Sequence, residues 1–302
     1  MSDTAVQQFL SKHQLPEQYA ELIAIRFAPI ATMLAQRRKI LGRPLLVGIN
    51  GCQGSGKSTL ADALVMLLEN NHGLRATALS IDDFYLTRAE REQLAGKVHP
   101  LLRTRGVPGT HDIELTRNTL QALTSAGNAP APVPRFDKAI DDRRPDSAWD
   151  SAERPQDIVI LEGWCVGATP QNAGELIDPV NDLEKNEDRD GSWRHYVNEC
   201  LEQDYQRLFS LFDVTMMLKA PAFDTVFRWR LEQEDKLRRM RHAEGADTSQ
   251  LMTPEQIKRF IQHYQRITEH SLRYLPQRVN VLFELNEQRN IVAQSTPRKL
   301  PA

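Results

Sequence analysis

The most informative part of the chain is the stretch LLVGINGCQGSGKS, which covers residues 45–58. Its mostly apolar beginning, residues 45–50, predicts a buried strand, and the remainder matches the phosphate-binding pattern G-x-x-x-x-G-K-[ST]. Residues 59–64, TLADAL, are typical of an opening helix. Glycines let backbone N–H groups close around a phosphate chain, because a Cβ would block the turn or the approach. The helix N-terminus adds unpaired N–H donors and a partial positive charge. The stretch therefore predicts a nucleoside triphosphate site.

The residues of this loop have separate tasks. We expect Lys57 to reach the β- and γ-phosphates and Ser58 to hold Mg²⁺ through its hydroxyl. The predicted nucleotide-binding set comprises Gly51, Gln53, Gly54, Ser55, Gly56, Lys57, Ser58 and Thr59.

Composition excludes several other classes of protein. The 302 residues include 38 Lys and Arg against 40 Asp and Glu, a formal charge of −2 that gives no bulk reason to expect a nucleic-acid partner or an anionic membrane. No apolar run approaches the roughly 20 residues that span a bilayer, and residues 1–8 lack the features of a signal peptide. The three cysteines, Cys52, Cys165 and Cys200, suggest neither zinc nor disulfides, and we expect an inert thiol at Cys52. These features predict a globular cytoplasmic protein, compatible with a monomer.

Four more apolar runs follow the first strand. They lie at residues 75–81, 157–161, 213–218 and 279–284, and helical stretches separate them. This alternation predicts an α/β fold with a doubly wound parallel sheet that helices cover on both faces. Ligands then gather at the carboxyl ends of the strands.

The remaining segments are assigned around this sheet. Helical spacing from about 17 to 42 ends in a basic trio, residues 37–39, which we expect to be a solvated helix end. The charge run 182–190 is expected in a solvated loop. Residues 188–191 match the GTPase pattern D-x-x-G, but because no strand precedes them we do not interpret them as a GTPase motif. The predicted parts are a helical N-terminal extension at 1–43, a P-loop domain at 44–290 and a tail at 291–302. Within the P-loop domain we expect an acceptor-site insertion at about 86–155, which holds a helix at about 113–125. The same domain is expected to contain a polar loop at about 165–192 and a lid-like helix at about 222–242.

Carboxylates follow two of the predicted strands. Asp82 and Asp83 come after the second strand and Glu162 after the third. Transfer of a phosphoryl group to a hydroxyl needs a base that takes the proton. We expect one carboxylate of the Asp82–Asp83 pair to be that base and the other to be structural, since Asp also caps turns. Glu162 stands where a carboxylate for Mg²⁺ or its waters is expected.

Two groups of cationic residues accompany these carboxylates. The helix near 222–242 carries Arg228, Arg230, Arg238, Arg239 and Arg241 among acidic residues, so most are expected in i,i+4 pairs on a wet face. A lid over a triphosphate needs one or two arginines, for which we select Arg230 and Arg238. In the insertion, Arg105, Arg135 and Lys138 could hold an anionic acceptor, and His111 lies in a Gly/Pro turn. A lone histidine of this kind is either structural or part of that polar cluster.

The order of these motifs resembles one family. The P-loop, SIDDFY at 80–85 and LEG at 161–163 resemble the small-molecule kinases grouped with uridine kinase, pantothenate kinase and phosphoribulokinase. RGVPGTHD at 105–112, PRFDKAIDD at 134–142, EGW at 162–164 and WRLEQE at 229–234 are most similar to plant-type D-glycerate 3-kinase and its fungal and bacterial relatives. The resemblance extends from about residue 44 to 286.

The resemblance implies a nucleoside-kinase-like P-loop fold and an enzyme that uses ATP and Mg²⁺ to phosphorylate a small hydroxy acid, D-glycerate first. It implies that Asp82 is the base, that Glu162 is the acidic residue near the metal, and that residues 286–289 lie near the adenine. Lys57 and Arg230 join Asp82 as the expected catalytic residues, with Ser58 and Glu162 at the metal. The expected acceptor site consists of Asp83, Tyr85, Arg105, His111, Arg135 and Lys138.

Two alternatives remain open from the sequence. The first is a kinase for another small acceptor, such as a nucleoside, pantothenate or a polyol. The second is a switch or assembly protein that hydrolyses the nucleotide without transferring its phosphoryl group. The absence of an N-K-x-D guanine motif and of an L-S-G-G-Q signature argues against the second.

Overall fold

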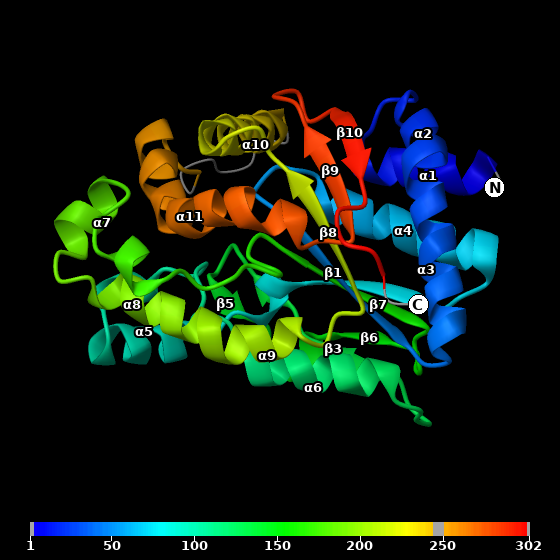
Figure 1. Cartoon of the computed structure of the whole chain (residues 1–302), viewed down its shortest axis with the longest axis horizontal. Helices are drawn as coiled ribbons and strands as arrows, with labels where there is room; N and C mark the ends of the chain where they lie inside the picture. Colours follow the sequence, from blue (N-terminus) through cyan, green and yellow to red (C-terminus); the bar gives the residue numbers. More distant parts are fainter. Residues whose placement is uncertain (1–2, 244–250, 301–302) are drawn as a thin grey trace.

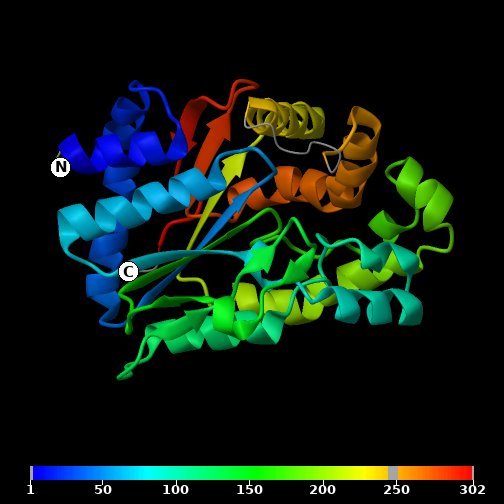
Figure 2. The same ribbon diagram turned by 180° about the vertical axis from the view of Figure 1, so that it is seen from behind.

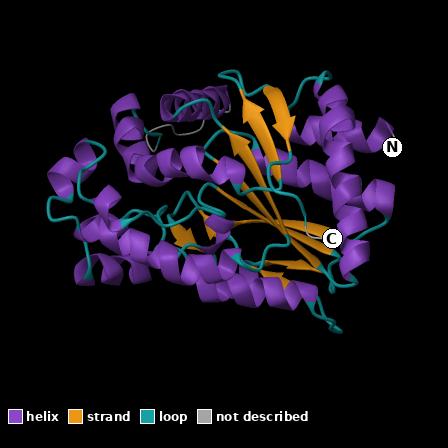
Figure 3. Cartoon of the chain, viewed as in Figure 1, coloured by secondary structure: helices purple, strands orange, loops and turns teal. Residues whose placement is uncertain are grey.

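The computed structural model describes residues 3–243 and 251–300. A six-stranded sheet lies in the middle, between helices (Figure 3), with the strand order β10-β9-β8-β1-β7-β2. The strands are β1 (Leu45–Gly51), β2 (Ala76–Ser80), β7 (Ile158–Gly163), β8 (Val214–Lys219), β9 (Val281–Leu285) and β10 (Ile291–Ser295). The five predicted strands are confirmed. Residues 291–295, predicted to belong to a tail, instead pair with β9 as an antiparallel edge strand.

Both faces of the parallel strands are buried, and successive side chains enter different cores. Ile158 and Ile160 of β7 belong to one hydrophobic cluster, whereas Val159 and Leu161 belong to the other. This is the period of two that a strand imposes, and burial on both faces explains why the strand reads as a continuous apolar run.

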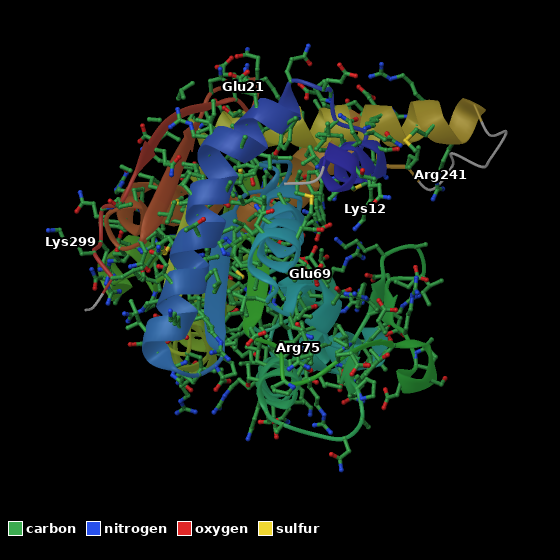
Figure 4. The ribbon with its side chains drawn as sticks, turned by 90° about the vertical axis from the view of Figure 1, so that its right-hand side faces the viewer. Lys12, Glu21, Glu69, Arg75, Arg241 and Lys299 are labelled. Atoms are coloured by element: carbon green, nitrogen blue, oxygen red, sulfur yellow. The ribbon has the colours of Figure 1, made fainter. Side chains whose placement is uncertain are left out.

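The N-terminal helices, together with α10, cover the first face. Val6 and Phe9 of α1 and Trp229 of α10 share the core of α3, α4 and the sheet. Figure 4 turns this side to the viewer, and Lys12, labelled there, reaches Asp62 of α4 at 3.4 Å. The N-terminal extension is therefore packed on the P-loop helix rather than separate from it. The helices here are α1 (Asp3–His13), α2 (Tyr19–Leu22), a π-helical segment (Ile23–Phe27), α3 (Ala28–Leu41), α4 (Lys57–His72) and α10 (Phe223–Ala243).

The second face is covered by helices from the middle and the later part of the chain (Figures 1 and 2). They are α6 (Ile113–Thr124), α8 (Ser192–Cys200), α9 (Gln206–Phe209) and α11 (Pro254–Tyr274). The insertion also contains α5 (Arg88–Lys97) and two small antiparallel pairs, β3 (Ala131–Val133) with β6 (Asp150–Ala152) and β4 (Phe136–Asp137) with β5 (Asp142–Arg143). The predicted helices at 113–125 and 222–242 correspond to α6 and α10.

The prediction of a solvated loop at 182–190 is wrong, whereas the basic trio 37–39 does lie near the end of α3, with Lys39 exposed. The charge run forms α7 (Asp182–Glu187), in which Glu184 is fully buried against Arg266 of α11 at 2.6 Å. Asp188 is also fully buried and pairs with Arg194 at 2.8 Å. In the basic trio Arg37 is buried. Glu184 and Asp188 each pair with an arginine of another helix, which local polarity does not reveal. Within the described residues, no helix is long and apolar enough to cross a membrane.

Candidate active site

The phosphate-binding loop connects β1 to α4 in a conformation that requires glycine. Gly54 has φ +79° and Gly56, at the N-cap of α4, has φ +89°, both in the left-handed region. A Cβ on Gly54 would also lie 2.8 Å from Cβ of Trp229. The Gln53 Oε1 and Ser55 Oγ atoms are buried and have no hydrogen-bond partner among residues 3–243 and 251–300. The loop thus presents polar atoms whose hydrogen bonds remain to be made.

Glu162 meets the beginning of α4. Its Oε1 accepts a hydrogen bond from Ser58 Oγ at 2.6 Å, and its Oε2 lies 3.8 Å from Lys57 Nζ. The Oε2 atom is buried and makes no hydrogen bond to any described residue. The β1–β7 register places Glu162 opposite Ile49, immediately before the loop. A serine hydroxyl beside an incompletely satisfied carboxylate oxygen fits the oxygen-ligand preference of Mg²⁺, which takes few protein ligands when phosphates supply the others.

Asp82 lies at the carboxyl end of β2, on a short 3₁₀ turn (Ile81–Phe84). Tyr85 OH donates to its Oδ1 at 3.0 Å, and Lys138 Nζ donates to its Oδ2 at 2.6 Å. Burial alone raises the pKa of this carboxyl, but the charges of Lys138 and Lys57 outweigh it. The pKa of Asp82 therefore lies well below its ordinary value, and the group is ionised.

Asp83 binds residues of the insertion. Its Oδ2 accepts from Arg135 Nη1 at 2.7 Å and its Oδ1 accepts from the Phe136 backbone N–H at 3.2 Å. Arg135 also donates to Asp150 at 2.6 Å. Asp83 and Arg135 thus bind each other and hold β4 in place, and their role in an acceptor site stays a prediction.

Arg105 and Lys138 are neighbouring cations beside Asp82. Arg105 pairs with Asp141 and stacks over the Phe136 ring at 5.4 Å. The charge of Arg105 acts on Lys138, opposing its protonation, while Asp82 has the larger effect and raises the pKa of Lys138. The structure therefore brings these two predicted acceptor residues together.

His111 is buried between two tyrosines. Its ring stacks on Tyr85 with centroids 4.4 Å apart, and its Nδ1 lies 2.6 Å from Tyr205 OH. Burial lowers its pKa to about 4, so the ring is neutral near pH 7. Its Nε2 has no hydrogen-bond partner in the described ranges. The structure thus places His111 behind Tyr85, one layer away from Asp82.

The arginines of α10 are mostly paired. Arg230 pairs with the buried Glu234 at 2.6 Å, and Arg238 binds Asp235 and the Met252 carbonyl at 2.7 and 3.0 Å. The charge of Arg230 acts on the Tyr264 hydroxyl, as do those of Asp82 and Arg105. Of the two arginines selected from the sequence, Arg230 is therefore the one whose charge reaches the same hydroxyl as the charges of Asp82 and Arg105.

The turn between β9 and β10 reaches the phosphate-binding loop. Arg289 Nε donates to the Gly54 carbonyl at 2.9 Å, and its guanidinium lies 5.3 Å from the centre of the Trp229 ring. Trp229 Nε1 donates to the Glu287 carbonyl at 2.7 Å. A cavity of about 310 Å³ lies here, lined by Arg228, Glu232, Glu287, Gln288 and Arg289. This places the predicted adenine-side segment next to the loop.

A larger cavity lies elsewhere. It has a volume of about 740 Å³, and it is lined by residues of α6, by residues from α8 to Tyr205 and by His111.

Sequence reasoning also missed Trp229, Tyr205 and Asp141. Trp229 occupies an apolar position of an otherwise charged helix, and the contacts that give the other two a place in the site join segments far apart in the chain.

No protein-family model matches the chain. An uncharacterized kinase of Schizosaccharomyces pombe is 36% identical to it over 249 residues, which cover 78% of this chain and 83% of the relative. The chloroplastic D-glycerate 3-kinase of Arabidopsis thaliana is 31% identical over 231 residues, or 73% of this chain. The match covers 46% of the plant enzyme, so the chain spans about half of its length.

A solved structure of D-glycerate 3-kinase from Cryptococcus neoformans has a similar fold. It superposes with a TM-score of 0.73 at 27% identity, covering 91% of this chain and 99% of the other. The similarity therefore extends over most of both chains.

Proposed function

The chain belongs to the P-loop kinase family that includes D-glycerate 3-kinase, and from this membership we propose that it transfers the γ-phosphoryl group of ATP to a hydroxyl of a small hydroxy acid, D-glycerate first. One observation carries the proposal: Asp82, at a strand end, is ionised and lies 2.6 Å from the ammonium of Lys138, and the charge of Lys57 also acts on it. A carboxylate that takes a proton from a hydroxyl, next to cations that bind an acid group, matches the needs of this reaction.

We assign the nucleotide to the loop residues 51–59, with Lys57 on the phosphates. Ser58 and Glu162 would hold Mg²⁺, which neutralises phosphate charge when bound. The 310 Å³ cavity at the β9–β10 turn is our candidate for the base of the nucleotide. Arg230 would move toward the transferring group from its pair with Glu234.

The acceptor would lie between Asp82 and the insertion. Its hydroxyl would face Asp82, and its carboxylate would face Lys138 and Arg105. Tyr85 and His111 form the wall behind Asp82, and their stacking fixes the Tyr85 hydroxyl on the carboxylate. The near-balanced charge of −2 supports a small molecule rather than a nucleic acid as the partner.

The test is ADP release from Mg·ATP by the purified protein across a panel of acceptors: D-glycerate, L-glycerate, uridine, pantothenate and pentose phosphates. We expect turnover with D-glycerate and at most weak turnover with the others. Turnover confined to a different alcohol would retain the kinase assignment and replace the acceptor. ADP release that no acceptor increases would contradict the proposed transfer and favour a nucleotide-hydrolysing switch.

A further inference from the structure

Lys138 occupies the oxygen of Asp82 that Tyr85 leaves available. Tyr85 OH donates to Oδ1, and Lys138 Nζ lies 2.6 Å from Oδ2. A base with an ammonium on one oxygen and a hydroxyl on the other is a poor acceptor for a further proton, because both hydrogen bonds favour the ionised form. In this arrangement Asp82 is held out of reaction.

The ammonium can leave without any movement of the backbone around it. The Lys138 side chain is 60% exposed, and lysine carries its charge on a flexible four-carbon stem. The hairpin that bears it is anchored on both sides, by Asp83 to Arg135 at 2.7 Å and by Asp141 to the buried Arg91 at 3.0 Å. Rotation of one side chain therefore separates Lys138 from Asp82 while β4 and β5 stay in place.

A second cation, Arg105, lies beside the hairpin that bears Lys138. Arg105 contacts the hairpin on both sides of Lys138: its guanidinium lies 5.4 Å from the centre of the Phe136 ring and pairs with Asp141, and its charge acts on that of Lys138. Each of the two cations has one carboxylate partner. An acid group placed between them would relieve their repulsion and compete with Asp82 for Lys138. Water cannot compete in this way, because it carries no charge.

We propose that the Lys138 ammonium blocks Asp82 until the carboxylate of the acceptor displaces it, an arrangement that we call the latch. Water does not displace the ammonium, so the enzyme suppresses ATP hydrolysis in the absence of its acceptor. The inference rests on the proposed function for the identity of the donor and the base. It adds a second role to Lys138, which then gives the enzyme a preference for acidic acceptors through the chemical step as well as through binding.

Hydrolysis, which is suppressed, and phosphoryl transfer to the acceptor, which is permitted, make and break corresponding bonds. The attacking oxygen forms a bond to the γ-phosphorus, the bond from that phosphorus to the β,γ-bridging oxygen breaks, and ADP leaves with the electron pair. The proton of the attacking hydroxyl goes to Asp82 in both cases. Inorganic phosphate results when water attacks, and a phosphate ester of the hydroxy acid results when the acceptor attacks.

The experiment measures ADP release without any acceptor in wild type and in Lys138→Met, which retains the length of the side chain and removes its charge. We expect acceptor-independent hydrolysis to rise roughly 10- to 100-fold, within what a freed general base contributes. In Lys138→Met the KM for D-glycerate should rise as well. Lys138→Arg restores the cation and should bring hydrolysis back toward the wild-type rate.

Two further variants make the result specific. Arg144→Ala removes another cation of the same segment, one that lies 3.8 Å from Asp137 and not on Asp82, and it should leave hydrolysis unchanged. Combining Lys138→Met with Asp82→Asn should abolish the gain, because the freed base is then missing.

Hydrolysis by Lys138→Met at the wild-type rate would overturn the latch, and so would a gain that survives the Asp82→Asn exchange. The proposed function fails by a different result, namely a wild-type enzyme that phosphorylates none of the acceptors. The comparison of hydrolysis rates without acceptor is independent of that panel, so the two failures are distinguishable.

Discussion

Asp82 and Asp83 are adjacent in the chain, yet their surroundings shift their pKa values in opposite directions. Burial raises the pKa of Asp83 despite its pair with Arg135. For Asp82 the same burial effect is outweighed by Lys138 and Lys57, and its pKa falls. The sequence predicts one catalytic and one structural carboxylate. In the structure Asp82 binds Lys138 and Asp83 anchors β4, and the catalytic assignment of Asp82 stays a prediction.

Replacement of Asp82 by Asn tests the proposed base. The amide retains the shape and cannot accept the hydroxyl proton as a carboxylate does, so kcat should fall by roughly 10²- to 10⁴-fold. ATP affinity, measured by nucleotide titration, should remain within about twofold because the phosphate ligands are unchanged. Asp146→Asn, on the exposed surface of the insertion, is the matched control. A kcat near that of wild type would remove the assignment.

The residues that sequence could identify are those whose position along a strand determines where they lie. Asp82 and Glu162 follow strands that run parallel, so their meeting at one edge of the sheet is predictable. The partners of Arg135 and Arg105 are not, because Asp83, Asp150 and Asp141 lie on separate turns and strands that only the folded insertion brings to them. A motif identifies the charges there, but which charges neutralise one another is decided by tertiary structure.

At the scale of elements, α7 shows how a charged sequence becomes buried. Arg266 of α11 donates to both carboxylate oxygens of Glu184, at 2.8 and 2.6 Å, and to the carbonyls of Glu175 and Asp178 at 2.7 Å each. One guanidinium thus ties α7 and the preceding loop to α11. The partners are 82 residues apart, so the hydropathy of residues 182–190 indicated solvent where there is a core.

Arg266→Ala is expected to be strongly destabilising. It leaves the fully buried Glu184 without its counter-charge, which costs about 3–5 kcal/mol in the free energy of unfolding. Arg259→Ala is the control on the same helix, since its pair with Glu187 is exposed (51% and 42%) and should contribute under about 1 kcal/mol. Urea unfolding of the two variants measures both values. Equal losses would contradict the structural role assigned to the buried pair.

The whole molecule is a sheet between two hydrophobic cores, and much of it was predictable. Five strands with intervening helices imply the doubly wound architecture, which the structure and its relatives share. The edge strand β10 was not predictable, because residues 291–295 are short and half exposed and gain their order from pairing with β9. Edge strands of this kind lack the apolar run that identifies the central strands.

Stability should decrease in mild acid through a buried histidine. Burial in α11 lowers the pKa of His263 to about 4, below its ordinary 6.5, so the unfolded chain binds more protons between these values. The free energy of unfolding is then fully present above pH 6.5 and falls as the pH drops, by about 2 kcal/mol at pH 5 for this one group. Unfolding curves of wild type and His263→Gln at pH 7.5 and pH 5 measure the difference.

The variant should lose less stability between the two pH values than wild type does. His72→Gln, at a half-exposed position of α4, is the matched exchange and should behave as wild type. A variant with an undiminished pH response would assign the acid sensitivity to other groups.

The hydrogen bond from Arg289 to the Gly54 carbonyl joins residues 235 positions apart. A ribosome delivers the loop 235 residues before the arginine, so the nascent chain carries an unfinished phosphate cradle over that interval. ATP can stabilise the fold through a complete cradle after the β9–β10 turn has emerged and docked. The nucleotide thereby acts as a ligand of folding that is selective for chains in which β9 and β10 are in place.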